Sequence, residues 1–106
     1  MIKIGDKIIN GSCEKHERAL KNLLKNIDSD HVYCNIYYWR NNGDLMGELD
    51  IIDYDEACIY EDKSSICGRR KAKEQLHRAK DYHKDKLGVD FDTYIKVLGK
   101  SPERID

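Results

Sequence analysis

Two β-rich runs on either side of a short acidic turn constrain this chain more than any other feature. Residues 47–52 read GELDII and residues 59–63 read IYEDK, with the acidic segment 53–56 (DYDE) before the second run. Apolar and β-branched residues that flank turn-forming acids are typical of a β-hairpin. The two runs therefore predict neighbouring strands joined by a tight connection.

The spacing of the charged residues predicts that several of them share one face of this hairpin. Side chains alternate between the faces of a strand, so Glu48 and Asp50 share a face of the first strand. Glu61 and Lys63 share a face of the second strand for the same reason. Carboxylate oxygens are ligands that Mg²⁺ prefers, and a lysine beside them can hold a phosphate or an attacking water. If the two faces coincide, the hairpin has the side chains for metal-assisted phosphodiester hydrolysis.

These residues resemble the active-site hairpin of the PD-(D/E)xK nuclease superfamily, and they are most similar to archaeal Holliday-junction resolvases and their small bacterial relatives. Asp50 matches the aspartate of the first motif, and Glu61 with Lys63 match the second motif. The resemblance implies that Asp50, Glu61 and the backbone carbonyl of Asp62 bind Mg²⁺ or Mn²⁺, while Lys63 orients the nucleophile or offsets the charge that builds up on the phosphate. Asp62 departs from the family pattern, which usually has an apolar residue there, so a solvated strand end and a shifted register both remain open.

An acidic residue interrupts the apolar stripe of an expected N-terminal helix. Ser12 is a suitable N-cap for this helix. The stripe that follows contains Cys13, Leu20, Leu24 and Ile27, and Glu17 occupies the position of the stripe between Cys13 and Leu20. Glu17 either lies at the edge of the stripe beside a basic partner or faces a metal site. The resemblance favours the metal site, because resolvases carry a glutamate followed by arginine in this helix, with Glu14 as the fallback.

The turn-forming and helix-terminating residues of the rest of the chain predict an α/β fold with the order αβββαβ. Three antiparallel strands are expected at residues 31–39, 45–53 and 57–63, then a helix to about residue 86 and a last strand at residues 94–98. Pro102 and the charged tail are expected to end the fold. This order is that of the restriction-endonuclease-like core, a mixed central sheet flanked by helices. The helix should bury Ala72, Leu76, Ala79 and Tyr82 or His83. The aromatic residues of the first strand are expected in the core or as cross-strand pairs, with base stacking as the alternative.

Positive charge is concentrated in the helix expected after the hairpin. Residues 69–86 contain eight Lys or Arg and three acids, whereas the whole chain has a formal net charge of −1. Such a segment either holds phosphate groups or is a solvated helix face. The residues expected to contact DNA are Arg69, Arg70, Lys71, Lys73 and Arg78. Gln75 and Lys71 either face the site, as the resemblance implies, or lie at the surface. Glu48 is either an outer acid of the site or part of a strand salt bridge.

The length of 106 residues predicts a single nuclease domain spanning residues 1–106. No apolar run is long enough to span a bilayer and no leader is visible, so a cytoplasmic protein without a membrane partner is expected. The four cysteines show no Cys-x-x-Cys pair. Buried thiols are therefore favoured over zinc ligands, and an oxidised pair remains open.

Three functions remain after the sequence has been considered. The first is a structure-selective DNA endonuclease similar to Holliday-junction resolvases, which act as homodimers in recombination and repair. The second is another DNA nuclease of the same fold that cuts duplex or single strands, as in restriction, repair or mobile elements. The third is a non-catalytic DNA-binding module, which would bind branched or duplex DNA without turnover whatever metal is supplied.

Overall fold

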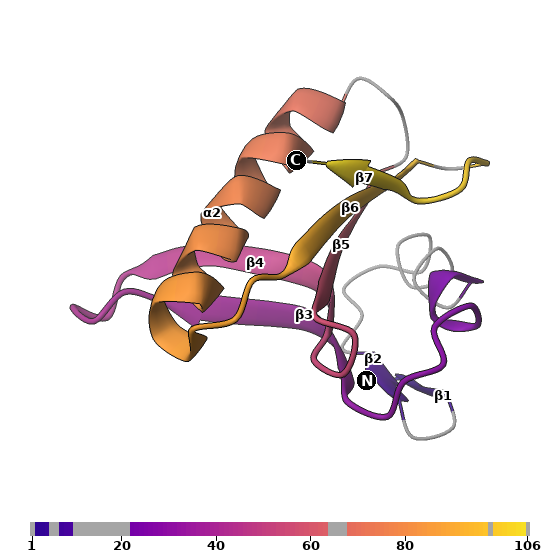
Figure 1. Cartoon of the computed structure of the whole chain (residues 1–106), viewed down its shortest axis with the longest axis horizontal. Helices are drawn as coiled ribbons and strands as arrows, with labels where there is room; N and C mark the ends of the chain where they lie inside the picture. Colours follow the sequence, from indigo (N-terminus) through magenta and orange to yellow (C-terminus); the bar gives the residue numbers. More distant parts are fainter. Residues whose placement is uncertain (1, 5–6, 10–21, 64–67, 98, 106) are drawn as a thin grey trace.

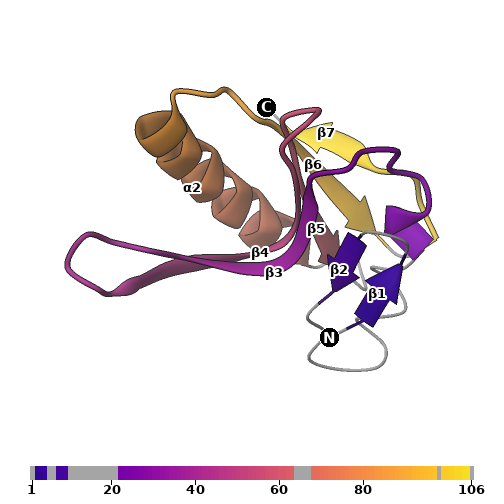
Figure 2. The same ribbon diagram turned by 90° about the horizontal axis from the view of Figure 1, so that it is seen from below.

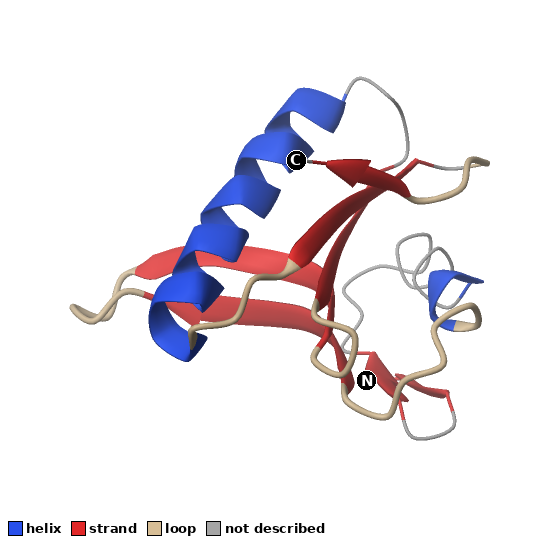
Figure 3. Cartoon of the chain, viewed as in Figure 1, coloured by secondary structure: helices blue, strands red, loops and turns tan. Residues whose placement is uncertain are grey.

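A computed structural model describes residues 2–4, 7–9, 22–63, 68–97 and 99–105. In this part of the chain seven strands form one mixed sheet in sequence order, and one long helix packs against it (Figures 1 and 3). The elements are β1 (Ile2–Ile4), β2 (Lys7–Ile9), β3 (Val32–Trp39), β4 (Leu45–Asp53), β5 (Cys58–Lys63), α2 (Arg69–Leu87), β6 (Asp92–Val97) and β7 (Glu103–Ile105). The expected α/β class is therefore confirmed.

The order of pairing agrees with most of the strands expected from the sequence. β3, β4 and β5 form an antiparallel meander, and α2 connects β5 to a parallel neighbour, β6. The three meander strands lie within one residue of their expected bounds, and β6 begins two residues before the expected position 94. The expectation that the fold ends at Pro102 is wrong, because β7 follows it and pairs antiparallel with β6.

An aspartate side chain shapes the turn between β4 and β5. Asp53 accepts hydrogen bonds from the backbone N–H groups of Asp55 and Glu56, at 3.0 and 3.1 Å. This local bonding is the reason that aspartate favours turns. The Ser29 hydroxyl donates to the other oxygen of the same carboxylate at 2.8 Å. The turn fixes the register of the hairpin, which places Ile52 opposite Ile59.

Helix α2 covers one face of the sheet, and the larger core lies between the helix and that face. Its buried residues recur at helical spacing, as the sequence predicted: Ala72, Leu76, Ala79 and His83. The helix ends at Gly88, which adopts the left-handed conformation with φ 69° and donates its N–H to the carbonyl of Lys84. Figure 1 shows α2 lying across β4, β5 and β6.

A second, smaller core lies around β3 and β4. Leu24 and Ile27, two residues of the stripe expected in the N-terminal helix, pack there with Ile51. The rest of that stripe, including Glu17, lies outside the described residues, as does the fallback Glu14. Cys34 and Cys58 are buried thiols, as expected. The other two cysteines, Cys13 and Cys67, lie outside the described residues.

The β3–β4 hairpin changes faces part-way along its length. The pair Cys34 and Ile51 belongs to the smaller core, whereas the pair Ile36 and Leu49, two residues further along, packs in the core under α2. Residues two apart in a regular strand share a face, so the strands must twist between these pairs. Asn35, between Cys34 and Ile36, has φ 52°, a left-handed conformation that produces such a change. Figure 2 shows the hairpin bending beneath α2 and extending past it.

Candidate active site

The bend in β4 brings two acidic side chains to the point where β4 and β5 separate. The last paired residues of this ladder are Ile51 and Tyr60, so Asp50 and Glu61 come next on their strands. The carboxylate of Asp50 accepts a hydrogen bond from the backbone N–H of Asp62 at 2.8 Å. A side chain therefore replaces the backbone partner that β4 no longer offers to β5.

Asp50 and Glu61 are both buried although both are acidic. Their exposed fractions are 8% and 3%, and the Oε1 atom of Glu61 is buried without a hydrogen-bond partner among the described residues. Burial, and then the neighbouring Asp50 carboxylate, raise the pKa of Glu61 to about 9, against the opposing effect of Lys63. Ionising two neighbouring buried carboxylates costs free energy through desolvation and mutual repulsion, and a bound cation would offset this cost.

Lys63 lies on the same side of the sheet and points toward α2. It follows Ile59 and Glu61 at spacings of two, and Ile59 packs in the core under the helix. The Lys63 ammonium donates to the side-chain oxygen of Gln75 on α2 at 3.3 Å. Its stem passes over Gly68, where a Cβ would lie 3.2 Å from the Lys63 Cδ. The structure thus brings together four of the predicted site residues: Asp50, Glu61, Lys63 and Gln75.

Two other predicted residues do not present their side chains to this point. Asp62 lies between Glu61 and Lys63 on the strand, so its side chain is on the opposite face and its backbone N–H bonds Asp50. Glu48 is exposed opposite the exposed Tyr37, whereas its neighbour Leu49 is buried under α2. The common face expected for Glu48 and Asp50 is therefore wrong, because the strand twists between them. Glu17 lies outside the described residues.

The donor set at this site fits a hard divalent cation. Asp50 and Glu61 offer adjacent carboxylates, and the Oε1 atom of Glu61, which has no hydrogen-bond partner among the described residues, could coordinate a cation. Among the described residues, no group of three or more His, Cys, Asp or Glu side chains is arranged to hold a metal. Mg²⁺ is usually bound by one or two carboxylates together with waters and substrate phosphates, so two carboxylates are a suitable set.

The basic residues predicted to bind DNA differ in their surroundings. Arg69 forms an ion pair with Glu103 at 2.6 Å, and Arg70 lies 3.9 Å from Glu74. Arg78 instead donates to a neutral acceptor, the carbonyl of Met46, at 3.4 Å. The remaining two, Lys71 and Lys73, are exposed on α2.

The sequence did not indicate that Tyr38 belongs to this neighbourhood. Tyr38 is 5% exposed, as expected for a core aromatic residue, and its ring lies 4.8 Å from that of Tyr82. Its hydroxyl lies against Gly47, and its phenol senses the charge of Glu61. The available signal was Gly47 itself, because a glycine inside an expected strand often marks the close approach of a neighbouring group.

The outer face of the β3–β4 hairpin is aromatic and open. Tyr37 and Trp39 are each 53% exposed, and Leu45, the pairing partner of Trp39, is 51% exposed. Of the two places expected for the aromatic residues of this strand, the core is therefore ruled out for Tyr37 and Trp39, and also for Tyr33, which is 42% exposed; all three lie at paired positions of the β3–β4 ladder. The bend explains this, because it turns Ile36 and Tyr38 toward α2 and their neighbours outward.

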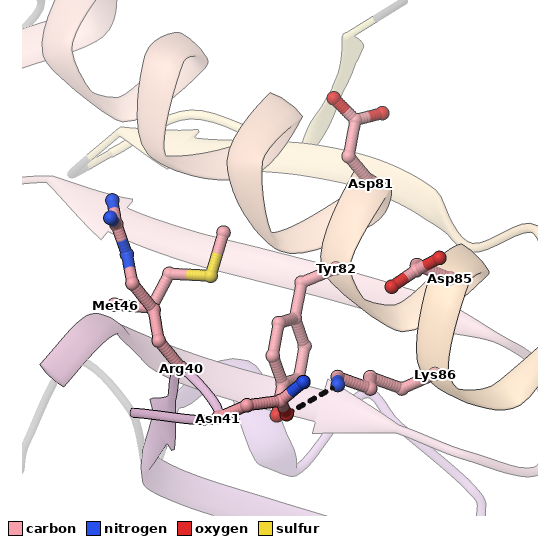
Figure 4. Close-up of a pocket in the computed structure, with 7 residues that line it drawn as sticks. All are labelled: Arg40, Asn41, Met46, Asp81, Tyr82, Asp85 and Lys86. Carbon is pink, nitrogen blue, oxygen red and sulfur yellow. Dashed lines mark hydrogen bonds between the residues drawn. The ribbon is translucent and has the colours of Figure 1, made fainter. Parts of the chain in front are cut away.

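A separate hollow of about 290 Å³ lies between the tip of this hairpin and the C-terminal half of α2 (Figure 4). Its floor is formed by Met46 and Tyr82, and Lys86 closes one side by donating to the side-chain oxygen of Asn41 at 2.8 Å. Two cations and two carboxylates line it: Arg40, Lys86, Asp81 and Asp85. The charges of this lining balance, and the hollow contains none of the predicted site residues.

Comparison of the chain with family models, with curated proteins and with solved structures gave no match. Among the helices that the structure describes, none is long and apolar enough to cross a membrane.

Proposed function

We propose that this chain is a metal-dependent DNA endonuclease that hydrolyses phosphodiester bonds. The observation that carries the proposal is the buried pair Asp50 and Glu61, which has a partnerless carboxylate oxygen and faces Lys63 across the α2 side of the sheet. Two carboxylates buried close together destabilise a fold when both are ionised, unless a cation binds them. Perturbed acids of this kind are typical of active sites.

The topology supports a restriction-endonuclease-like core. Three antiparallel strands, a helix and a strand parallel to the third follow in the order that the PD-(D/E)xK resemblance implies. The matched residues Asp50, Glu61 and Lys63 lie at the centre of this unit, where β4 and β5 separate. Two independent lines, the motif and the order of elements, therefore support one proposal.

Each site residue has a distinct role in the proposed reaction. Asp50 and Glu61 would hold Mg²⁺ or Mn²⁺, together with the carbonyl of Asp62 and with Glu17. Such an ion, when bound, polarises the phosphate and lowers the pKa of a bound water. Lys63 places a positive charge where the attacked phosphate gains negative charge, and Gln75 holds that ammonium in place at 3.3 Å. Asp50 also fixes the local backbone through the N–H of Asp62.

For the substrate we propose branched DNA, cut by a homodimer in the cytoplasm. Contacts to phosphate position a nucleic acid without specifying its sequence, which suits a structure-selective enzyme. Two-fold symmetry would allow two strands of a junction to be cut alike.

A cleavage panel tests this function. Labelled linear duplex, flap and four-way-junction DNA would be incubated with Mg²⁺ or Mn²⁺ and with wild type, Asp50→Asn, Lys63→Ala or the exposed control Glu56→Gln. We expect cleavage by wild type and the control, and a loss of at least about a hundredfold in both site variants, with DNA binding retained. Salt-sensitive binding without turnover under every metal condition would refute the enzyme, and preferred cutting of linear duplex would refute the branched substrate.

A further inference from the structure

Two side chains from different elements meet at one peptide bond beside the proposed active site. A Cβ at Gly47 would collide with the Tyr38 hydroxyl and would lie 2.8 Å from the Tyr38 Cε1 atom, so Tyr38 lies directly over the backbone of Gly47. Arg78 reaches the same peptide unit from α2 by donating to the Met46 carbonyl at 3.4 Å. The Tyr38 hydroxyl and the Arg78 guanidinium therefore lie near each other.

This meeting point is adjacent to the acidic pair. Arg78 is one turn of α2 beyond Gln75, the residue that holds Lys63, so the two positions lie about 4.5 Å apart along the helix axis. The charges that act on the Tyr38 phenol also indicate that Arg78 and Glu61 lie close to it. Burial raises the pKa of the Tyr38 phenol, the charge of Arg78 opposes this rise, and the charge of Glu61 adds to it.

The meeting point is also open to a ligand. Arg78 is exposed and Gly47 is half-buried, whereas Tyr38 is 5% exposed, so a ligand would reach this edge of the core from the side of Arg78. Among the described residues no carboxylate forms an ion pair with Arg78, whereas Arg69 and Arg70 each have an acidic neighbour. A guanidinium next to a phenol offers several donors in a fixed direction, which suits a phosphate group.

We propose that Tyr38 and Arg78 bind the phosphate next to the one that is cut, so that the site holds two consecutive phosphates of one DNA strand. This inference rests on the proposed function. The acidic pair and Lys63 take the first phosphate, and Tyr38 with Arg78 takes its neighbour. The Gly47 backbone is the platform that sets the position of the phenol, because any side chain there would displace it.

Single neutral phosphates in the substrate test this inference. A methylphosphonate, which removes one negative charge, would be placed in turn on each side of the cleaved bond, and kcat/KM would be measured for wild type and for Tyr38→Phe, Arg78→Gln and their double variant. We expect one of the two placements to lower kcat/KM of wild type by about ten- to a hundredfold, the effect of one charge-assisted hydrogen bond. The same placement should cost the double variant less than about twofold.

Matched controls separate a phosphate contact from a packing role. Tyr82→Phe removes a hydroxyl from the neighbouring ring, and Lys84→Gln removes a cation further along α2; both should retain the wild-type response to methylphosphonate. If every protein loses the same factor at both placements, or wild type loses nothing at either, the second phosphate site is refuted while the nuclease stands. Failure of wild type to cut the unmodified strand would instead refute the proposed function, and this inference with it.

Discussion

Replacing Glu61 by glutamine should remove a pH dependence of stability that the buried acidic pair creates. The pKa of Glu61 is raised from 4.5 to about 9, so the folded protein holds a proton that the unfolded chain releases. The stabilisation is fully present below pH 4.5 and is lost as the pH rises toward 9. Glutamine has nearly the same shape and never ionises, so the variant should lack this loss.

The magnitude follows from the linkage between protons and folding. One proton contributes at most about 1.4 kcal/mol per pH unit, so between pH 6 and pH 8 the wild type should lose about 2–3 kcal/mol more than Glu61→Gln. For a domain of this size that difference corresponds to a relative change in Tm of roughly 10 °C or more. The exposed control Glu56→Gln should follow wild type.

Thermal unfolding in chelator and in Mg²⁺ provides the assay. In chelator, the Tm of wild type should fall relative to that of Glu61→Gln from pH 6 to pH 8. At pH 8, Mg²⁺ at a hundred times its Kd should stabilise wild type by about 2.7 kcal/mol, and it should have little effect on the variant. Parallel pH curves for the two proteins would show that Glu61 does not hold an extra proton in the folded protein. Equal stabilisation by Mg²⁺ would show that the Glu61 carboxylate does not bind the ion.

Three further predictions concern the surroundings of the site. Gly47→Ala should lower the free energy of unfolding by about 1–3 kcal/mol, because the new methyl overlaps Tyr38, and a melt that matches wild type would contradict this packing. NMR titration of His31 should give a pKa above 6.5 that returns toward 6.5 in Asp55→Asn, because the 2.8 Å contact between them favours the imidazolium; an unchanged value would exclude that contact. Trp39, the single tryptophan of the chain, should be readily quenched by acrylamide, and a protected, blue-shifted emission would show that its face is covered.

The hairpin at the centre of the site could be predicted because its determinants are local. The turn-forming carboxylate of Asp53 sets the connection, and the strand period then carries the register as far as Ile51 and Tyr60. The next residues on each strand, Asp50 and Glu61, therefore meet as expected. Helix α2 was equally predictable from its apolar spacing and from the glycine that ends it.

The bend of the β3–β4 hairpin could not be predicted, since it depends on a single backbone conformation. Asn35 has a positive φ, which asparagine tolerates but does not require. Beyond Asn35 the side chains of the hairpin therefore lie on the faces opposite to those of a regular strand, so Glu48 does not share a face with Asp50, whereas Tyr38 packs on the side of α2. β7 was missed for another reason, because three residues with two exposed charges lack the apolar alternation that marks a strand.

Crystals of the protein with uncleavable DNA and Mn²⁺ would show directly whether Asp50 and Glu61 hold a metal ion against a DNA phosphate. The anomalous signal of manganese identifies the ion independently of the protein density. We expect a peak within coordination distance of the Asp50 and Glu61 carboxylates and of a DNA phosphate oxygen, with Lys63 beside that phosphate. Manganese bound elsewhere, or a phosphate backbone that does not approach these two acids, would contradict it.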